Sequence, residues 1–449
     1  MTDDFATAVS AIVGPERALG LDSAALRRIR WPLGDGIVPV AGAAPETSDQ
    51  VVSLVRLARE RALGLAIQYD DRGTGATHRG ERRTLVLDLS RMNKIVEVHA
   101  DGAAATLEPG VTFAQLAEHL KGTGLCVASG RDPDASVLGS AYSRDFGYTP
   151  YGDHALMLCG AEYVTIAGRQ MRTGMGAMPQ SRTWHLYKFS LGPYSDGLAM
   201  QSGALVPTMA GIWLMPKPPS IQFFCVELQS EDALAPAIEN LRQLKIGNVL
   251  PGTVTLADPA LHKAIVGSRD NRGAWRLYGA VYGTAATVPI VRAIIDNTLS
   301  GIRDARFLTD GEMRADPACR EHVALMAGAP GSSAVKLDGV RSTEQMSFVA
   351  PIEGRHSLRM AQIARDAFAG SGLRCGIEQN LVGRSLIQRV WMGCAGEEKI
   401  LVDAATSLVA RMADEGFGLI GQSFALSAVA RRALSGQYIV QEQALLALS

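Results

Sequence analysis

A run rich in glycine, proline and tyrosine at residues 147–154 constrains the fold of this chain more than any other feature. It reads Gly-Tyr-Thr-Pro-Tyr-Gly-Asp-His, and it places Asp153 and His154 where neither a long helix nor a long strand can continue. Irregular segments of this kind carry function more often than core packing. We therefore interpret Asp153 as a functional carboxylate, with a capping role in a tight turn as the alternative. A packed, hydrogen-bonded histidine is the better interpretation of His154.

The chain has 449 residues, a length typical of two or three domains. Its 44 Lys and Arg residues are balanced by 45 Asp and Glu residues, so no basic excess points to a nucleic-acid partner. The six cysteines are scattered and form no Cys-x-x-Cys pair, so we expect no metal site. The sequence shows neither an apolar run of about 18 residues nor a secretory pattern at its start, which predicts a cytoplasmic protein without membrane contact.

Hydrophobic periodicity divides the chain into two parts that both mix helices and strands, which predicts the α+β fold class. The proline cluster at 216–219 is the clearest boundary, so we expect one domain over 1–219 and a second over 220–414. Ser48 or Asp49 is expected to cap the second helix, and Thr112 the third. The predicted helices cover residues 5–30, 48–63, 112–120, 233–244, 288–299, 406–415 and 423–433. The predicted strands cover residues 65–69, 84–89, 95–98, 104–108, 210–215, 222–228 and 276–283, with a further strand near 250, and a hairpin is expected within 161–169.

Six motifs follow one another in a fixed order along the chain. They are Arg-Gly-Thr-Gly at 72–75, Leu-Ser-Arg-Met-Asn-Lys-Ile at 89–95, Glu-Pro-Gly-Val-Thr at 108–112, the run at 147–154, Arg-Thr-Gly-Met-Gly at 172–176 and Trp-Leu-Met-Pro-Lys-Pro-Pro at 213–219. Together they resemble the vanillyl-alcohol oxidase/p-cresol methylhydroxylase (PCMH) family of FAD-linked oxidases. The resemblance is strongest over residues 45–220 and continues weakly to about residue 430. Several ordered motifs are more specific than any single glycine loop.

This resemblance implies a PCMH-type FAD-binding domain over 1–219, a cap domain with an antiparallel sheet over 220–414, and a short segment over 415–449 that returns to the FAD-binding domain. It also implies a flavin-dependent oxidoreductase that takes hydride from a small aromatic or specialised-metabolite substrate, and a homodimer. Glycine-rich loops suit the cofactor because backbone N–H groups can approach a diphosphate closely where side chains are absent. The residues that the resemblance assigns to cofactor binding are Arg72, Gly73, Thr74, Gly75, Pro109, Gly110, Val111, Gly139, Ser140, Ser143, Tyr148, Tyr151, Gly152 and Thr208.

By the same resemblance, Asp153 would stand near the reactive flavin N5 atom, where a carboxylate can tune the flavin or accept a proton from the substrate. Arg384 and Arg389 of the second domain would orient the substrate, although surface ion pairing is the alternative for each arginine. Family members often attach the flavin covalently through a histidine or tyrosine of the second domain. The last histidine here is His356, and residues 383–392 offer no credible attachment residue, so we expect non-covalent FAD.

Several positions depart from the pattern of the family. Asp70 and Asp71 begin the glycine loop, where their charges would repel a diphosphate unless Arg72 offsets one of them or both carboxylates point to solvent. Thr74 stands where the phenol oxidases of the family carry a phenolate-binding tyrosine. Ile420 and Gly421 stand at the positions of a Tyr-Arg pair that serves the same phenolate. A simple 4-alkylphenol is therefore disfavoured as the substrate, because its charge would lack donors.

Two further departures lie on a segment near the expected cofactor, where Leu205 adds bulk and Pro207 removes a backbone donor. Together, these departures keep a second hypothesis open. In it, the chain is a repurposed family member that has lost flavin redox chemistry and serves as a non-redox enzyme or a partner subunit. A hydrolase is the weakest interpretation, because the chain contains neither a His-Glu-x-x-His nor a Gly-x-Ser-x-Gly motif.

Overall fold

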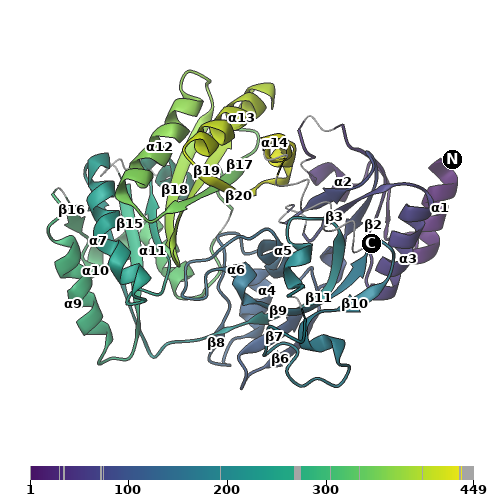
Figure 1. The fold of residues 1–449 in the computed structure, drawn as a ribbon, viewed down its shortest axis with the longest axis horizontal. Coiled ribbons are helices and arrows are strands. Elements are labelled where there is room, and N and C mark those ends of the chain that lie inside the picture. Colours follow the sequence, from purple (N-terminus) through teal and green to yellow (C-terminus); the bar gives the residue numbers. More distant parts are fainter. Residues whose placement is uncertain are drawn as a thin grey trace.

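The computed structural model describes residues 2–29, 31–33, 36–70, 73, 75–192, 194–266, 275–303, 305–332, 334–396, 398–433 and 436. The chain folds into an N-terminal lobe, on the right in Figure 1, and a C-terminal lobe, on the left. The N-terminal lobe carries two five-stranded sheets, and the C-terminal lobe carries one eight-stranded sheet. This combination of helices with parallel and antiparallel sheets confirms the predicted α+β fold class.

The first sheet of the N-terminal lobe is parallel at its centre and antiparallel at its edges. Its order is β1-β2-β5-β3-β4, from β1 (Ala18–Leu19), β2 (Val38–Ala43), β3 (Gly64–Gln68), β4 (Thr77–Arg79) and β5 (Arg83–Asp88). Helix α3 (Ser48–Glu60) connects β2 to β3, since parallel strands need a crossover. The helix buries Val51, Leu54, Val55 and Ala58 on one face, as its amphipathic pattern predicts. Thr47 caps it, one residue before Ser48 and two before Asp49, the two predicted caps.

The prediction of one continuous helix over residues 5–30 is wrong. Helix α1 (Thr2–Val13) ends at Gly14, which has a φ of +86°. Glycine adopts this left-handed conformation without the strain that a side chain would cause, and so it ends helices well. The chain then forms β1 and a short helix α2 (Ala24–Arg28) that begins with a Ser23 cap. The helical spacing in the sequence was therefore correct locally but did not reveal the break.

The second sheet of the N-terminal lobe is antiparallel throughout. Its order is β10-β9-β11-β7-β6, from β6 (Ile95–His99), β7 (Ala104–Leu107), β9 (Leu158–Thr165), β10 (Gln170–Arg172) and β11 (Leu205–Trp213). Strands β9 and β10 form the predicted hairpin. A small additional sheet pairs β8 (Leu125–Cys126) with β12 (Met215–Pro216). The connections carry α4 (Phe113–His119), which Thr112 caps as predicted, α5 (Val137–Tyr142) and α6 (His154–Met157).

The C-terminal lobe is built on one antiparallel sheet of order β16-β13-β15-β14-β18-β19-β17-β20. Its strands are β13 (Ser220–Leu228), β14 (Val254–Ala257), β15 (Trp275–Gly283), β16 (Ala305–Phe307), β17 (Glu344–Pro351), β18 (Arg374–Val382), β19 (Ser385–Gly393) and β20 (Gly418–Gln422). Helices α7 (Leu234–Ile246), α9 (Val288–Leu299), α12 (Gly354–Phe368) and α13 (Glu398–Asp414) share one apolar core with this sheet. A second apolar cluster joins Cys225 of β13 to α8 (Pro259–Val266), α10 (Asp310–Ala315), α11 (Pro317–Met326) and Tyr148 of the N-terminal lobe.

The start of the C-terminal segment differs from the expectation that residues 415–449 return to the first domain. Strand β20 adds to the edge of the C-terminal sheet by pairing with β17. The segment also reaches the N-terminal lobe, where Gln201 donates to the carbonyl of Ile420 at 2.9 Å and the Phe424 ring lies 6.1 Å from that of Trp31. Helix α14 (Ser427–Ala433) lies between the two lobes in Figure 1. Residues 437–449 lie outside the described residues. Within the part of the chain that the structure describes, no helix combines the length and apolar character needed to cross a membrane.

Candidate functional site

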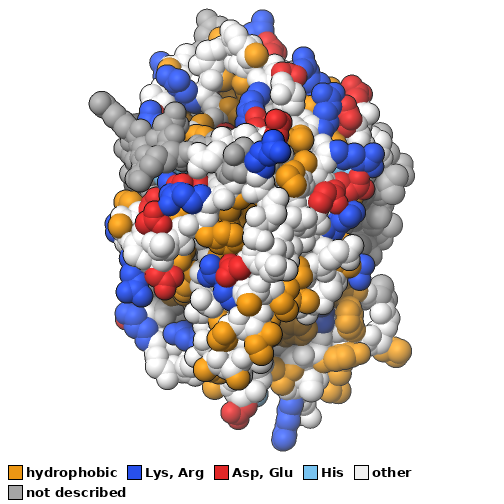
Figure 2. Space-filling model, turned by 90° about the vertical axis from the view of Figure 1, so that its left-hand side faces the viewer, with side chains coloured by type: hydrophobic (Ala, Val, Ile, Leu, Met, Phe, Trp, Pro, Cys, Tyr) orange, Lys and Arg blue, Asp and Glu red, His pale blue; other side chains and the backbone are white. Residues whose placement is uncertain are grey.

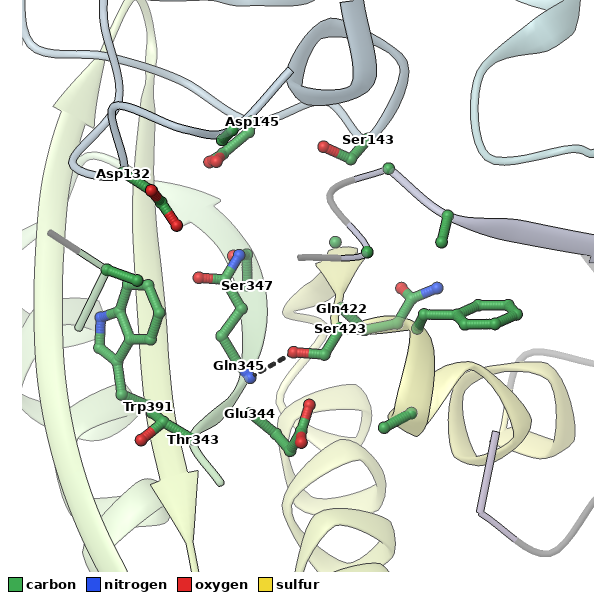
Figure 3. Close-up of a pocket in the computed structure, with 18 of the residues that line it drawn as sticks. Asp132, Ser143, Asp145, Thr343, Glu344, Gln345, Ser347, Trp391, Gln422 and Ser423 are labelled. Atoms are coloured by element: carbon green, nitrogen blue, oxygen red, sulfur yellow. Dashed lines mark hydrogen bonds between the residues drawn. The ribbon is translucent and has the colours of Figure 1, made fainter. Parts of the chain in front are cut away.

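A cavity of about 470 Å³ lies between the two lobes and is lined by residues of both. In Figure 3, Asp132, Ser143 and Asp145 of the N-terminal lobe stand on one side, opposite Gln345 and Trp391 of the C-terminal lobe. The C-terminal side is one face of the sheet, because Gln345 pairs with Trp391 and Ser347 pairs with Arg389 across β17 and β19. Side chains two residues apart on a strand point to the same face, so this register turns all four toward the cavity.

The glycine loop after β3 forms part of the N-terminal wall. Gly75 has a φ of +68°, and a Cβ atom at this position would lie 2.2 Å from the carbonyl oxygen of Gly139 in α5. The loop backbone can therefore approach α5 only because residue 75 has no side chain. Gly73 also lines the cavity, with open space around its Cα atom. The predicted cofactor residues Arg72 and Thr74 lie outside the described residues.

Asp70 does not point to solvent, contrary to one of the two interpretations of this loop. Its side chain is buried, and it accepts a hydrogen bond of 2.7 Å from the backbone N–H of Ser136. The Ser136 hydroxyl in turn caps α5 by accepting from the Gly139 N–H. The Asp70 carboxylate therefore fixes the start of α5 relative to the glycine loop. Asp71 lies outside the described residues.

Two serines of the α5 region, Ser140 and Ser143, line the cavity, and their role in cofactor binding stays a prediction. The Ser140 Oγ lies 2.8 Å from Nδ1 of His154, which is buried and packs against the Phe113 ring. Burial lowers the pKa of His154, so the imidazole is neutral near pH 7. His154 is thus the packed, hydrogen-bonded histidine that the sequence favours, and it orients a hydroxyl group on the cavity wall.

The other predicted cofactor residues in the described part of the chain lie outside the cavity lining. Gly110 donates its N–H to the carbonyl of Met92, and the Thr208 hydroxyl donates to Glu162, so both are engaged within the N-terminal lobe. The Tyr148 hydroxyl donates to Glu378 at 2.9 Å. The members of this group are Pro109, Gly110, Val111, Gly139, Tyr148, Tyr151, Gly152 and Thr208. A role for them in FAD binding stays a prediction.

Of the three predicted catalytic residues, one lines the cavity and two do not. Arg389 lines the cavity and is buried, as expected for a residue that acts on a ligand. Arg384 is exposed in the two-residue turn between β18 and β19, and the cavity lining does not include it. Asp153 is partly exposed and caps α6 by accepting from the Leu156 N–H at 3.1 Å, and it does not line the cavity either. The catalytic roles of Arg384 and Asp153 therefore find no support in the cavity geometry and stay predictions.

A buried ionic network crosses from one lobe to the other beside the cavity. Arg131 of the N-terminal lobe donates to Glu378 of β18 at 2.8 Å. Arg389 contacts the other oxygen of Glu378 at 3.5 Å, and its Nη2 also donates to the carboxylate of Asp145. Burial alone would raise the pKa of Glu378, but the charges of Arg131 and Arg389 outweigh it and hold this pKa at about 2.

His322 of α11 completes the network as a neutral acceptor. Its Nδ1 lies 2.8 Å from the carbonyl oxygen of Ala318 and must carry the proton to donate there. Its Nε2 is then free to accept from Arg131 Nη2 at 3.0 Å. Burial and the neighbouring Arg131 lower the pKa of His322 to about 3, which agrees with this neutral state. The ring stacks on Tyr278, with 3.7 Å between the ring centroids.

Sequence reasoning missed four residues of this network: Arg131, Asp145, His322 and Glu378. Glu378 gave little signal, because its strand also carries Arg374, Gln379 and Asn380 and so does not have an apolar pattern. Asp145 stands two residues before the run at 147–154. The partners themselves could not be read from the sequence, since Arg131 and Glu378 are 247 residues apart.

Comparisons with known proteins agree with this architecture. The family model described as "FAD binding domain" matches residues 39–174. The chain is 30% identical over 365 residues to the 4-cresol dehydrogenase [hydroxylating] flavoprotein subunit of Pseudomonas putida. The matched residues cover 75% of this chain and 70% of that protein. It is 30% identical over 217 residues to 1'-carboxy-chondrochloren decarboxylase of Chondromyces crocatus, over 47% of this chain and 40% of the relative.

Two solved structures share the fold along nearly the whole chain. The 4-ethylphenol oxidase from Gulosibacter chungangensis, in its isoeugenol complex, matches with a TM-score of 0.87 and 23% identity, over 99% of this chain and 93% of that one. A p-cresol methylhydroxylase with substrate bound matches with a TM-score of 0.84 and 24% identity, over 96% of this chain and 91% of that one. At these identities the structural matches establish the fold alone.

Proposed function

Because the chain belongs to the vanillyl-alcohol oxidase/p-cresol methylhydroxylase family of FAD-linked oxidases, we propose that it oxidises a small aromatic substrate with non-covalently bound FAD. The family membership makes it a flavin-dependent oxidoreductase. The substrate class and the mode of FAD attachment are the proposed parts. The observation that carries the proposal is that one cavity joins Gly73, Gly75 and Ser140 on its N-terminal wall to Arg389 and Trp391 on its C-terminal wall.

The residues of the cavity suit the diphosphate part of an FAD molecule. Its volume of about 470 Å³ falls within the range of small-molecule and cofactor sites, roughly 300–1,000 Å³. Gly73 faces open space in the cavity, so the loop backbone there can approach a diphosphate, and the missing Cβ of Gly75 lets the same loop pack against α5. Gly73, Gly75, Ser140 and Ser143 are the residues that would hold the cofactor. When bound, FAD supplies a hydride acceptor at its N5 atom.

The chain's own residues would hold and orient the substrate. Trp391 and Phe113 give the cavity aromatic surfaces, which suit a planar ring. Names of the relatives point the same way, since one is a 4-cresol dehydrogenase and another a 4-ethylphenol oxidase. Gly421 lines the cavity without a side chain, so the described lining offers no donor where those phenol oxidases would need one. We therefore propose an aromatic substrate other than a simple 4-alkylphenol.

Non-covalent attachment is supported by the positions of the histidines. His356 lies on α12 and contacts Glu353 and the Phe417 ring, and it is not part of the cavity lining. His78 is the one histidine of the described lining, and its Nε2 lies 3.0 Å from the Thr84 hydroxyl. Acid precipitation of the purified holoprotein should therefore release all of the flavin into the supernatant. Flavin that stays in the pellet of the wild type but not of His78→Ala would identify a covalent link instead.

Spectroscopy tests the proposed activity directly. The purified protein, after incubation with FAD, should show the visible absorbance bands of a bound flavin. Mixing it anaerobically with a panel of aromatic alcohols, amines and acids should bleach these bands with at least one member, because hydride transfer reduces the flavin. A protein that takes up no FAD would contradict the proposal and favour the repurposed, non-redox alternative. Bound FAD that no aromatic compound reduces would contradict the aromatic substrate class alone.

We also propose a homodimer formed through the C-terminal lobe. Hydrophobic side chains are densest over the lower half of the face in Figure 2, at the end of the lobe where α9 lies in Figure 1. Ile290 and Ile294 of α9 are 63% and 43% exposed and lie one helical turn apart on the same face, and adjacent exposed apolar side chains of this kind mark interaction surfaces. Light scattering should give twice the mass of one chain, and Ile290→Glu should halve it. Ile400→Glu on α13 is the matched control, and a monomeric wild type would contradict the proposal.

A further inference from the structure

Two buried arginines on the cavity wall have donor atoms without partners. Arg131 is 6% exposed, and its Nε and Nη1 atoms have no hydrogen-bond partner among the described residues. Arg389 is 3% exposed, and its Nε atom also lacks a described partner. Both side chains line the cavity between the lobes. A buried charged donor left unpaired is costly, so native proteins satisfy such groups with protein, water or ligand.

The two guanidinium groups are held close together and cannot turn away to find other partners. Arg131 Nη2 contacts Oε1 of Glu378, and Arg389 Nη1 contacts Oε2 of the same carboxylate. Arg389 is further fixed by the carbonyl of Phe146 at 3.1 Å and lies over the Phe146 ring at 3.7 Å. The free N–H groups of both arginines therefore belong to one preorganised cluster, because a shared carboxylate sets their separation.

The charge and shape of the cavity favour an anionic aromatic ligand. Its described lining contains six Arg or Lys side chains and three Asp or Glu side chains. Arg389 and Trp391 lie two residues apart on β19, so they share one face and stand about 7 Å apart along the strand. Gly376 of β18 pairs with Trp391 and adds no side chain beside the indole. One aromatic acid can therefore contact the indole with its ring and the arginines with its carboxylate.

We propose that Arg131 and Arg389 form a subsite for a carboxylate on the substrate, so that the reaction proposed above acts on aromatic carboxylic acids. Guanidinium N–H groups match the two oxygens of a carboxylate in geometry and in charge. This inference rests on the proposed function for the identity of the reaction. The binding of the acid itself depends only on the two arginines and the neighbouring indole.

Calorimetric titration of the holoprotein with benzoate and with benzamide tests the subsite, because these probes share a ring and differ in charge. Benzoate should bind at least tenfold more tightly than benzamide. Arg131→Lys and Arg389→Lys keep the positive charge beside Glu378 but remove the free guanidinium donors. Each should weaken benzoate binding about tenfold, leave benzamide binding unchanged and retain the flavin absorbance of the wild type. Arg374→Lys, at the exposed start of β18 and outside the cavity lining, is the matched control and should bind both probes like the wild type.

Three results would overturn the subsite. Equal affinity for benzoate and benzamide would mean that no carboxylate is recognised. Loss of flavin from the lysine variants in proportion to the loss of benzoate binding would mean that the arginines serve the cofactor. Unchanged benzoate binding in both variants would place the acid elsewhere. The proposed oxidation can fail independently, because an enzyme that prefers benzoate but is reduced by no aromatic compound keeps the subsite and loses the reaction.

Discussion

A close backbone approach on the cavity wall depends on a single residue, Gly75. Replacing it with alanine should cost about 1–2 kcal/mol in left-handed strain, as at any non-glycine residue with positive φ. The added Cβ atom would also meet the Gly139 carbonyl at 2.2 Å and push the loop away from α5. Gly75→Ala should therefore purify with a small fraction of the wild-type flavin. Gly122→Ala carries similar strain at φ +81° and meets no atom within 4 Å, but it lies outside the cavity lining, so it should retain most of the flavin.

The ratio of flavin absorbance to protein absorbance measures this difference, and thermal melting of the two apoproteins measures the shared strain. Equal flavin loss in both variants would show that backbone strain alone controls binding and that the contact with α5 is unimportant.

Asp153 can be tested for capping and for catalysis with one pair of variants. Its carboxylate accepts from the Leu156 N–H at the start of α6, and an asparagine can accept the same bond. Asp153→Asn should therefore keep both stability and turnover, whereas Asp153→Ala should lose about 1 kcal/mol of stability. Denaturant unfolding and the rate of flavin reduction are the two measurements. A folded Asp153→Asn protein that no longer reduces its flavin would instead support the catalytic role inferred from the sequence.

At the scale of helices and strands, the sequence predicted local features correctly. It did not show which segments far apart in the chain pair with one another. The predicted helix at 288–299 coincides with α9, and Thr112 caps α4 as expected, because spacing and capping are properties of neighbouring residues. Strand β20 was missed, since its place depends on the free edge of β17 about seventy residues earlier in the chain. The glycine loop and Arg389 could be assigned to the site through the family resemblance, but Arg131 and Asp145 needed the folded structure.

The position of α11 gives the protein a pH-dependent stability. The helix buries His322, whose pKa is lowered to about 3, while the same side chain in the unfolded chain binds a proton near pH 6.5. The free energy of unfolding therefore decreases progressively as the pH falls from 6.5 toward 3. At pH 5.5 the contribution of His322 to this decrease is about 1 kcal/mol. His322→Phe keeps a ring on Tyr278 but cannot be protonated. Its melting temperature should fall less than that of the wild type between pH 7.5 and pH 5.5, although it starts lower because Arg131 loses an acceptor.

Circular dichroism melts of both proteins at the two pH values are sufficient for this comparison. Both proteins carry further buried histidines. The difference between them in how far the melting temperature falls from pH 7.5 to pH 5.5 therefore isolates the contribution of His322. An identical pH dependence in the variant would mean that His322 is not neutral in the folded protein.

At the scale of the whole molecule, FAD should couple the two lobes, because the cavity proposed to hold it takes its walls from both. A ligand that binds only the folded state at one hundred times its Kd stabilises that state by about 2.7 kcal/mol. If FAD bridges the lobes, this stabilisation reaches the C-terminal sheet as well as the glycine loop. Hydrogen exchange of the apoprotein with and without FAD should then slow in peptides from β17 and β19 and in peptides around α5. Gly75→Ala, which should bind little FAD, serves as the control for effects of free cofactor. Slowing confined to the N-terminal lobe would mean that FAD binds without contact to the opposite wall, and Arg389 and Trp391 would then face the substrate alone.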